Sequence, residues 1–214
     1  MAAASDPDPT VSLGVIGGRA YSPEYPKPDP RELFDAITQW TLVMIPKTSP
    51  KSTPTLIGGG EPWGQHVPVR LWLTGHVDTL ILHLAAVFDV PAARFEAGAN
   101  GYGEQLNRAH DDFQRETGID SLAELRHAIN AGVTVVTHDS VKERDRVIAE
   151  ARILVAYTWN AAPFPTERGT AGIWSQSRSM RVCVPLHTLC TIQPLVPSEA
   201  RGSTPPTAAS EGHD

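Results

Sequence analysis

Cysteine, basic stretches and long apolar runs are scarce in this sequence, and each scarcity excludes a class of protein. The only two cysteines are Cys183 and Cys190, which favours a reduced, cytoplasmic setting over a disulfide-rich secreted one, although the two could pair. The most apolar run, residues 71–88, is interrupted by two histidines and an aspartate, so it is more typical of a buried strand and helix than of a membrane span. The chain begins with a short acidic stretch rather than a basic one, which argues against a secretory signal. We therefore expect a soluble cytoplasmic protein with no membrane partner.

The charge balance disfavours nucleic acid as the main partner. The formal net charge is −6, because 24 acidic side chains outnumber 18 basic ones. No basic stripe is visible that would neutralise a phosphate backbone. The chain length suits one domain with a sizeable core, and no internal repeat divides it.

Strand-like and helix-like segments alternate along the chain. Runs of β-branched and apolar residues predict strands over 11–16, 69–73, 93–96, 133–136, 153–158 and 182–184. Helical spacing of apolar residues, together with N-capping patterns, predicts helices over 30–43, 77–88, 104–116, 121–131, 140–151 and from 171 onward. This alternation predicts an α/β fold with a mainly parallel sheet covered by helices on both faces.

Three polar or proline-rich segments lie outside this pattern. Residues 1–10 and 194–214 are rich in small and polar residues, and we expect both to be disordered. Residues 46–67 contain many Pro, Gly, Ser and Thr residues without periodicity, so we expect a long loop inserted in the domain. The sequence thus predicts a single domain over 11–193 with long loops.

Three glycine turns lie between a predicted strand and a predicted helix. They are Gly17-Gly18-Arg19, Thr74-Gly75-His76 and Arg168-Gly169-Thr170. A helix N-terminus leaves backbone N–H groups without an intrahelical partner, and glycine lets a ligand approach the backbone closely. Because the carboxyl ends of parallel strands meet at one edge, we expect the three turns to converge on one crevice that binds a phosphate or carboxylate. The alternative for each is a plain tight turn, with Thr170 as an N-cap.

Three features of the chain, taken in order, resemble the SLOG superfamily, a Rossmann-like group that includes the DprA-type, LOG-type and YspA-type proteins. The features are a strand ending in Gly-Gly-Arg, a Gly turn with an early Asp in the following helix, and a helix with an Arg-Asn pair that feeds a buried strand and a Gly-Gly-Thr or Arg-Gly-Thr turn. Here they are Gly17-Gly18-Arg19 with Tyr21, Thr74-Gly75-His76-Val77-Asp78, and Arg144-Asp145 with Leu154-Val155-Ala156-Tyr157 and Arg168-Gly169-Thr170. The similarity spans roughly residues 12–186.

The resemblance implies a Rossmann-like domain that holds a nucleotide or a nucleotide-derived small molecule. The ligand contacts expected from the turns and from the resemblance are Gly17, Gly18, Arg19, Tyr21, Gly75, His76, Asp78, Arg144, Arg168, Gly169 and Thr170. Two positions depart from the family. Asp145 stands where the family has Asn, and Ile173 stands where a LOG-type hydrolase has Glu.

Three functional hypotheses follow, from different classes. The first is a binding module that holds the ligand without chemistry. The second is a hydrolase of the N-glycosidic bond of a nucleotide, with Asp78 and Asp145 as the carboxylates near the sugar. The third is an interaction scaffold with a vestigial crevice, in which the segments 46–67 and 194–214 bind the partner.

The charged candidates also have purely structural interpretations. Asp78, in the first turn of a predicted helix, would complement the helix dipole. Asp145 falls with Val141 and Ile148 on one helix face, so a buried carboxylate there needs a partner, which Arg144 or a neighbouring loop would supply.

We expect no cofactor and no metal site. His76, Asp78, His138 and Asp139 have suitable side chains, but their spacing matches no known ligand pattern. The sequence leaves homo-oligomerisation open.

Overall fold

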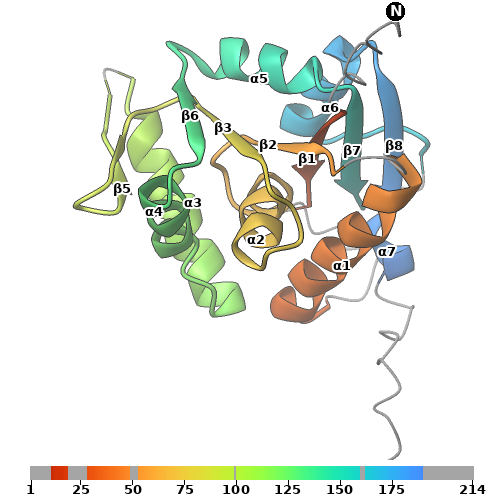
Figure 1. Ribbon diagram of the computed structural model, residues 1–214, viewed down its shortest axis with the longest axis horizontal. Coiled ribbons are helices and arrows are strands. Elements are labelled where there is room, and N and C mark those ends of the chain that lie inside the picture. Colours follow the sequence, from red (N-terminus) through yellow and green to blue (C-terminus); the bar gives the residue numbers. More distant parts are fainter. Residues whose placement is uncertain (1–10, 19–27, 49–52, 99, 160–161, 190–214) are drawn as a thin grey trace, which may run out of the picture.

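A six-stranded parallel sheet forms the centre of the protein, as the computed structural model shows (Figure 1). The structure describes residues 11–18, 28–48, 53–98, 100–159 and 162–189. The strands of this sheet are β1 (Ser12–Gly17), β2 (Thr55–Gly58), β3 (Leu80–Leu84), β6 (Thr134–Thr137), β7 (Ile153–Thr158) and β8 (Met180–Pro185). A short antiparallel hairpin is made by β4 (Phe88–Asp89) and β5 (Arg94–Phe95).

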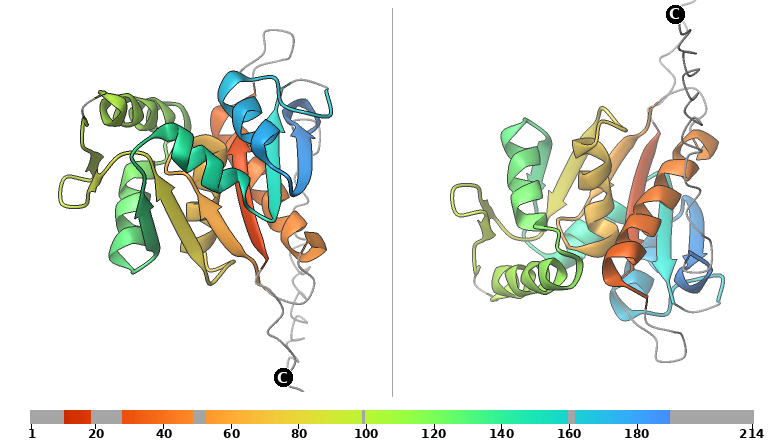
Figure 2. Two further views of the ribbon diagram at one scale, coloured as in Figure 1. Left: turned by 90° about the horizontal axis from the view of Figure 1, so that it is seen from above. Right: turned by 90° about the horizontal axis from the view of Figure 1, so that it is seen from below.

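Helices cover both faces of the sheet (Figures 1 and 2). They are α1 (Pro30–Thr48), the 3-10 helix η1 (Trp63–His66), α2 (Val67–Leu73), α3 (Tyr102–Thr117), α4 (Ser121–Asn130), α5 (Val141–Ala149), α6 (Arg168–Gln176) and α7 (Leu186–Leu189). In Figure 1, α5 and α6 lie above the sheet and α1 and α2 lie below it. The predicted single-domain, Rossmann-like α/β fold is confirmed.

The strand order is β6-β3-β2-β1-β7-β8. Strands that follow β1 are therefore added first on one side of it and later on the other. Gly14 of β1 is in register with Ile57 of β2 on one side and Leu154 of β7 on the other. The chain first builds the sheet outward from β1 to β6, then returns through α5 to place β7 and β8 on the opposite side of β1.

Alternating side chains of the strands supply two separate cores. Leu13, Val15 and Val155 point into the larger core, which α1, α2, α3, α4 and α7 cover. Ile16 and Leu154 point to the other face, where they pack against α5 and α6. Because strands of the central sheet are buried on both faces, they contain continuous apolar runs instead of alternating ones.

Most of the predicted elements are present close to their expected ends. The strands predicted at 11–16, 133–136, 153–158 and 182–184 are β1, β6, β7 and β8. Two predicted N-caps are present. Asp29 Oδ1 accepts from the Arg31 and Glu32 amides at 2.8 and 3.0 Å, and Ser140 Oγ accepts from the Glu143 amide at 3.2 Å. The helix at 121 is capped by Asp120, one residue before the predicted start.

The predictions for 46–88 are wrong. The supposed loop at 46–67 contains β2 and η1, the predicted strand at 69–73 belongs to α2, and the predicted helix at 77–88 contains β3 and β4. A run as short as Val-Arg-Leu-Trp-Leu at 69–73 does not distinguish a strand from a buried helical turn. Pro68, in the first turn of α2, is the helix signal in this run, because proline suits a position whose N–H has no intrahelical partner.

None of the helices in the described part of the chain is both long enough and apolar enough to cross a lipid bilayer.

Candidate functional site

The carboxyl ends of β1 and β7 form the point where the sheet topology reverses. After β1 the chain passes to α1 on one face, and after β7 it passes to α6 on the other. In open parallel sheets the loops at such a point separate and leave a crevice for a ligand. We call the sheet edge that contains these strand ends the carboxyl rim and the opposite edge the amino rim.

The glycine turn after β1 lies directly against the first turn of α6. Gly17 and Gly18 have φ angles of +87° and +103°, in the region that favours glycine. The Gly18 amide donates to the Tyr157 carbonyl oxygen of β7 at 3.0 Å. A Cβ on Gly17 would lie 2.2 Å from that oxygen and 3.2 Å from Thr170 Cγ2. Two of the three predicted turns therefore meet at the carboxyl rim.

The start of α6 is open. The first hydrogen bond of the helix is donated by the Ala171 amide to the Glu167 carbonyl oxygen at 2.8 Å. The amides of the residues before Ala171 therefore have no acceptor within the helix. Arg168 and Gly169 are exposed, and a Cβ added to Gly169 would meet nothing within 4 Å. The Glu167 carboxylate is tied back to β7, where its Oε1 accepts from Thr158 Oγ1 at 2.6 Å.

A third glycine turn at the carboxyl rim, Gly58 to Gly64 at the end of β2, was not among the predicted site residues. It lies against β1, since a Cβ on Gly64 would be 2.5 Å from the Gly17 carbonyl oxygen. Two of its residues have positive φ, Gly60 at +71° and Trp63 at +64°. The sequence signal for this turn is the run of three glycines after Leu56-Ile57. The prediction of a loop over 46–67 did not recognise the strand before these glycines, and so it missed the turn.

A buried cluster of charged and polar side chains holds the turn after β2 in place. Arg144 of α5 is only 2% exposed and donates to Glu61 Oε1 at 2.6 Å and to Asp145 Oδ1 at 2.6 Å. Tyr102, at the start of α3, donates to the same Glu61 oxygen at 2.6 Å, and Gln65 Nε2 donates to Glu61 Oε2 at 3.0 Å. The cluster thus ties α5, α3 and the β2 turn together, and Arg144 is engaged by protein groups.

The cluster holds two carboxylates around one guanidinium, and this arrangement affects the pKa values of Asp145, Arg144 and Tyr102. Burial raises the pKa of Asp145, and the nearby Glu61 carboxylate raises it further, against the opposing effect of Arg144. Burial opposes the charge of Arg144, but Glu61, Tyr102 and Asp145 outweigh it and raise the pKa of Arg144. Burial and Glu61 likewise raise the pKa of the Tyr102 phenol. Tyr102 and Arg144 therefore keep their protons, while the surroundings of Asp145 disfavour its charged form.

A buried histidine of α3 also holds the turn after β2. His110 of α3 is 1% exposed, and its two ring nitrogens pair with the Gly60 carbonyl oxygen at 2.9 Å and with Ser121 Oγ at 2.7 Å. Burial, followed by the effect of His66, lowers the pKa of His110 to about 4. The ring is therefore neutral at physiological pH.

The third predicted turn is not part of this site. Gly75, His76 and Asp78 follow α2 and precede β3, so they lie at the amino rim. Convergence of all three turns is thus wrong, because the supposed strand before Gly75 is a helix and the supposed helix after it is a strand. Asp78 is exposed there, and its backbone oxygen accepts from Trp72 Nε1 at 3.3 Å.

The structure separates the other predicted site residues as follows. Gly17, Gly18, Gly169 and Thr170 come together, and Arg168 is exposed beside them. Arg19 and Tyr21 lie outside the described residues. The histidine and aspartate residues considered for a metal are divided, since His138 and Asp139 follow β6 at the carboxyl rim while the others lie at the amino rim.

A hollow of about 520 Å³ lies elsewhere, between the first turn of α1, α2 and α4. Its charged lining is already paired: Glu124 contacts Arg70, and Glu124 Oε2 lies 2.9 Å from His66 Nε2. These pairings outweigh burial and lower the pKa of Glu124. We therefore place the candidate site at the carboxyl rim, where backbone donors are open.

Comparison with known proteins adds a single distant similarity. An uncharacterized protein of Acanthamoeba polyphaga mimivirus is 28% identical over 123 residues, which are 56% of this chain and 64% of that protein. The match therefore covers less than two thirds of the relative's length. No protein-family model matches the chain. No solved structure matches it.

Proposed function

We propose that this protein binds a nucleotide or a nucleotide-derived small molecule at the carboxyl rim, with a phosphate between Gly17-Gly18 and the first turn of α6. The observation that carries the proposal is the proximity of Gly17 to Thr170, whose Cγ2 would lie 3.2 Å from a Cβ on Gly17, at the topological switch point. The open amides of α6 and the positive end of its dipole favour an anion there.

The rest of the ligand would extend along the rim toward the turn after β2. Glu61 and Asp145 lie in that direction and are only partly buried, with side chains 31% and 17% exposed. Carboxylate oxygens accept hydrogen bonds from sugar hydroxyl groups, so this part of the rim would hold a ribose. Arg168 would add a charge-assisted bond to the phosphate.

The binding test compares two glycines of the same helix. Neither Gly169 nor Gly172 has an atom within 4 Å of an added Cβ, so both positions have open space for a side chain. Gly169→Val would cover the open amides, whereas Gly172→Val lies one turn further along. We expect calorimetric titration with nucleoside mono- and diphosphates, and mass spectrometry of co-purifying molecules, to detect a ligand in the natural protein and in Gly172→Val. Gly169→Val should bind at least tenfold more weakly.

Equal binding by the two variants, or no nucleotide bound by the natural protein, would refute the proposal. Inorganic phosphate serves as a second probe. If phosphate alone binds with the same affinity as the nucleotides, the site recognises an anion and not a nucleotide.

A second candidate function is hydrolysis of the N-glycosidic bond of the bound nucleotide. It is favoured by the raised pKa of Asp145 beside the Glu61 carboxylate, since such hydrolysis needs a carboxyl group near the sugar. Glu61 replaces Asp78 in this hypothesis, because Asp78 lies at the other rim. Ile173, at the position of the LOG-type Glu, is buried against the sheet.

Release of free base from nucleoside monophosphates would be measured by chromatography. We expect Asp145→Asn and Glu61→Gln to lose turnover while still binding nucleotide. Turnover that survives both substitutions would exclude these carboxylates from the chemistry.

A further inference from the structure

Within the described part of the chain, the edge strand β6 exposes a row of backbone groups without a strand partner. β6 pairs with β3 on one side and is the last strand of the sheet on the other. All four of its residues, Thr134 to Thr137, are exposed, and Val135 and Val136 are each 37% exposed. Every residue is β-branched and none is charged or proline, so the strand is well suited to pairing and lacks the features that normally prevent it.

The opposite edge of the sheet is protected. β8 carries Arg181 and ends in Pro185, two residue types that hinder edge-to-edge pairing. Arg181 also lies over the Trp174 ring at 5.1 Å and donates to the Trp174 carbonyl oxygen at 3.2 Å. The two edges therefore differ in their readiness to accept another strand.

The hydrogen bonds between β6 and β3 determine which groups of β6 face outward. The His138 amide donates to the Leu84 carbonyl oxygen at 2.8 Å, so even-numbered residues of this segment direct their backbone groups toward β3. In a β-ladder the direction alternates, so Val135 and Thr137 direct theirs to the free edge. The next outward amide, that of Val133, already donates to the Ala128 carbonyl oxygen at 3.3 Å.

We propose that β6 pairs antiparallel with β6 of a second copy of this chain, across a two-fold axis at Val136. In this register Val135 and Thr137 of each copy exchange their outward hydrogen bonds with Thr137 and Val135 of the other. Val136 faces its own counterpart in a close, non-hydrogen-bonded position, with Cα atoms about 4.5 Å apart. A register centred on Val135 is excluded, because it requires the Val133 amide that α4 already uses.

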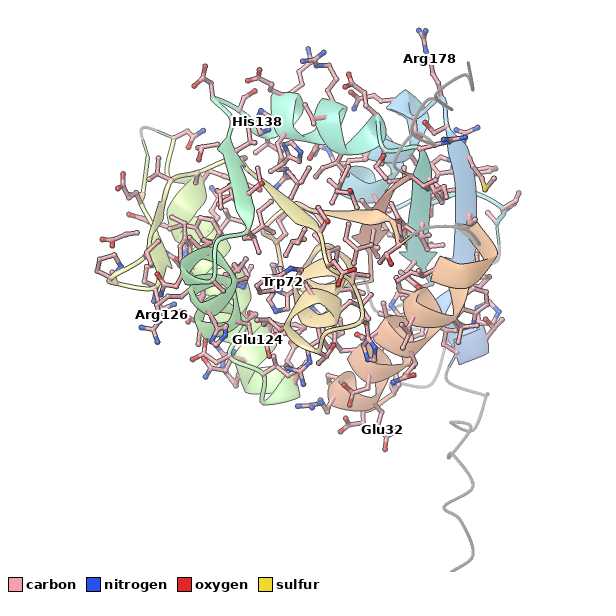
Figure 3. The ribbon with its side chains drawn as sticks, viewed as in Figure 1. Glu32, Trp72, Glu124, Arg126, His138 and Arg178 are labelled. Carbon is pink, nitrogen blue, oxygen red and sulfur yellow. The ribbon has the colours of Figure 1, made fainter. Side chains whose placement is uncertain are left out.

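The charges at the two ends of β6 are mixed and permit this arrangement. Asp139, Lys142 and Glu143 follow the carboxyl end, which His138 marks in Figure 3, while Glu124, Arg126 and His127 lie on α4 before the amino end. An antiparallel pair therefore brings no block of like charges together. The register itself favours a second copy, because each strand offers the same two outward residues, Val135 and Thr137, and the two-fold pair uses both.

The interface is short, since β6 has four residues. We therefore expect a dimer that dissociates in the micromolar range or weaker. Sedimentation velocity of the full chain over low to high micromolar concentration should show a monomer–dimer equilibrium. Hydrogen exchange should slow at the Val135 and Thr137 amides on dimerisation, while the Val136 amide is protected in both states.

Three substitutions test the register. Val135→Pro removes an outward amide but none of the bonds to β3, and Val136→Lys places two like charges on the axis. Both should be monomeric, with circular dichroism of the natural fold. Met180→Lys, an exposed apolar position on β8 (59% exposed), should dimerise as the natural chain does.

A natural chain that stays monomeric at high micromolar concentration would overturn the proposal. So would dimers that survive both β6 substitutions, or dimers lost on Met180→Lys. If the natural chain is monomeric but captures an added strand peptide at β6, the edge serves another partner and the second-copy proposal fails.

Discussion

The turn after β2 and the first turn of α6 both contain glycine, and both lie against Gly17 at the carboxyl rim. The β2 turn is filled by protein: a Cβ on Gly59 would lie 1.6 Å from Gln65 Oε1, and Glu61 is bonded to three side chains. At α6, a Cβ on Gly169 would meet nothing within 4 Å. The same residue type thus serves internal packing in one turn and leaves the backbone accessible in the other, and only the second has backbone donors open to a phosphate.

The sharpest test of this comparison exchanges one arginine in each region for methionine. Arg144→Met leaves the Glu61 and Asp145 carboxylates without their cation, so we expect a loss of about 3 kcal/mol in the free energy of unfolding. Arg168→Met, at the exposed start of α6, should change it by less than about 0.5 kcal/mol. Urea denaturation of both variants measures the difference. Similar losses would mean that the β2 turn is not held by the charge cluster.

The second test uses pH, because the β2 turn depends on a neutral histidine. The folded-state pKa of His110, about 4, lies below the unfolded value of 6.5, so the unfolded chain binds more protons between these pH values. Stability is therefore full above pH 6.5 and falls as pH drops toward 4, by about 3 kcal/mol from this residue. Burial and His138 also lower the pKa of His83, which acts in the same direction.

To isolate the contribution of His110, melting temperatures of the natural protein and of His110→Gln would be recorded from pH 7 to pH 4. The variant should have a shallower dependence on pH. Parallel curves would show that His110 is not the group that titrates.

The smallest effects are expected from alanine in place of single glycines. Gly17→Ala should cost about 2 kcal/mol, because alanine is strained at φ +87° and its Cβ meets the Tyr157 carbonyl oxygen. Gly169→Ala should instead stabilise by about 0.5 kcal/mol, since alanine favours the helix and the position is open. Thermal unfolding of the pair gives the signs directly. A destabilised Gly169→Ala would show that this turn is packed in solution.

The sequence was sufficient for the elements with clear boundaries and failed where one stretch had two interpretations. Asp29 and Ser140 cap their helices as predicted, since capping is a local interaction. The run from 69 to 88 has apolar residues in both its helix and its strand, so the two were interchanged and Gly75 was assigned to the wrong rim. The partner of Arg144 lies 83 positions away at Glu61, and no local pattern signals such a pair.

The central position of β1 has a consequence for synthesis of the protein. Leu13 is in register with Ile153, so β1, although among the first segments to be made, acquires its second neighbour only after most of the chain has been translated. Until then one side of the middle strand has no partner, and contacts of such long sequence separation form slowly. Fragments that stop before β7 would therefore expose this side of β1 and be prone to aggregation.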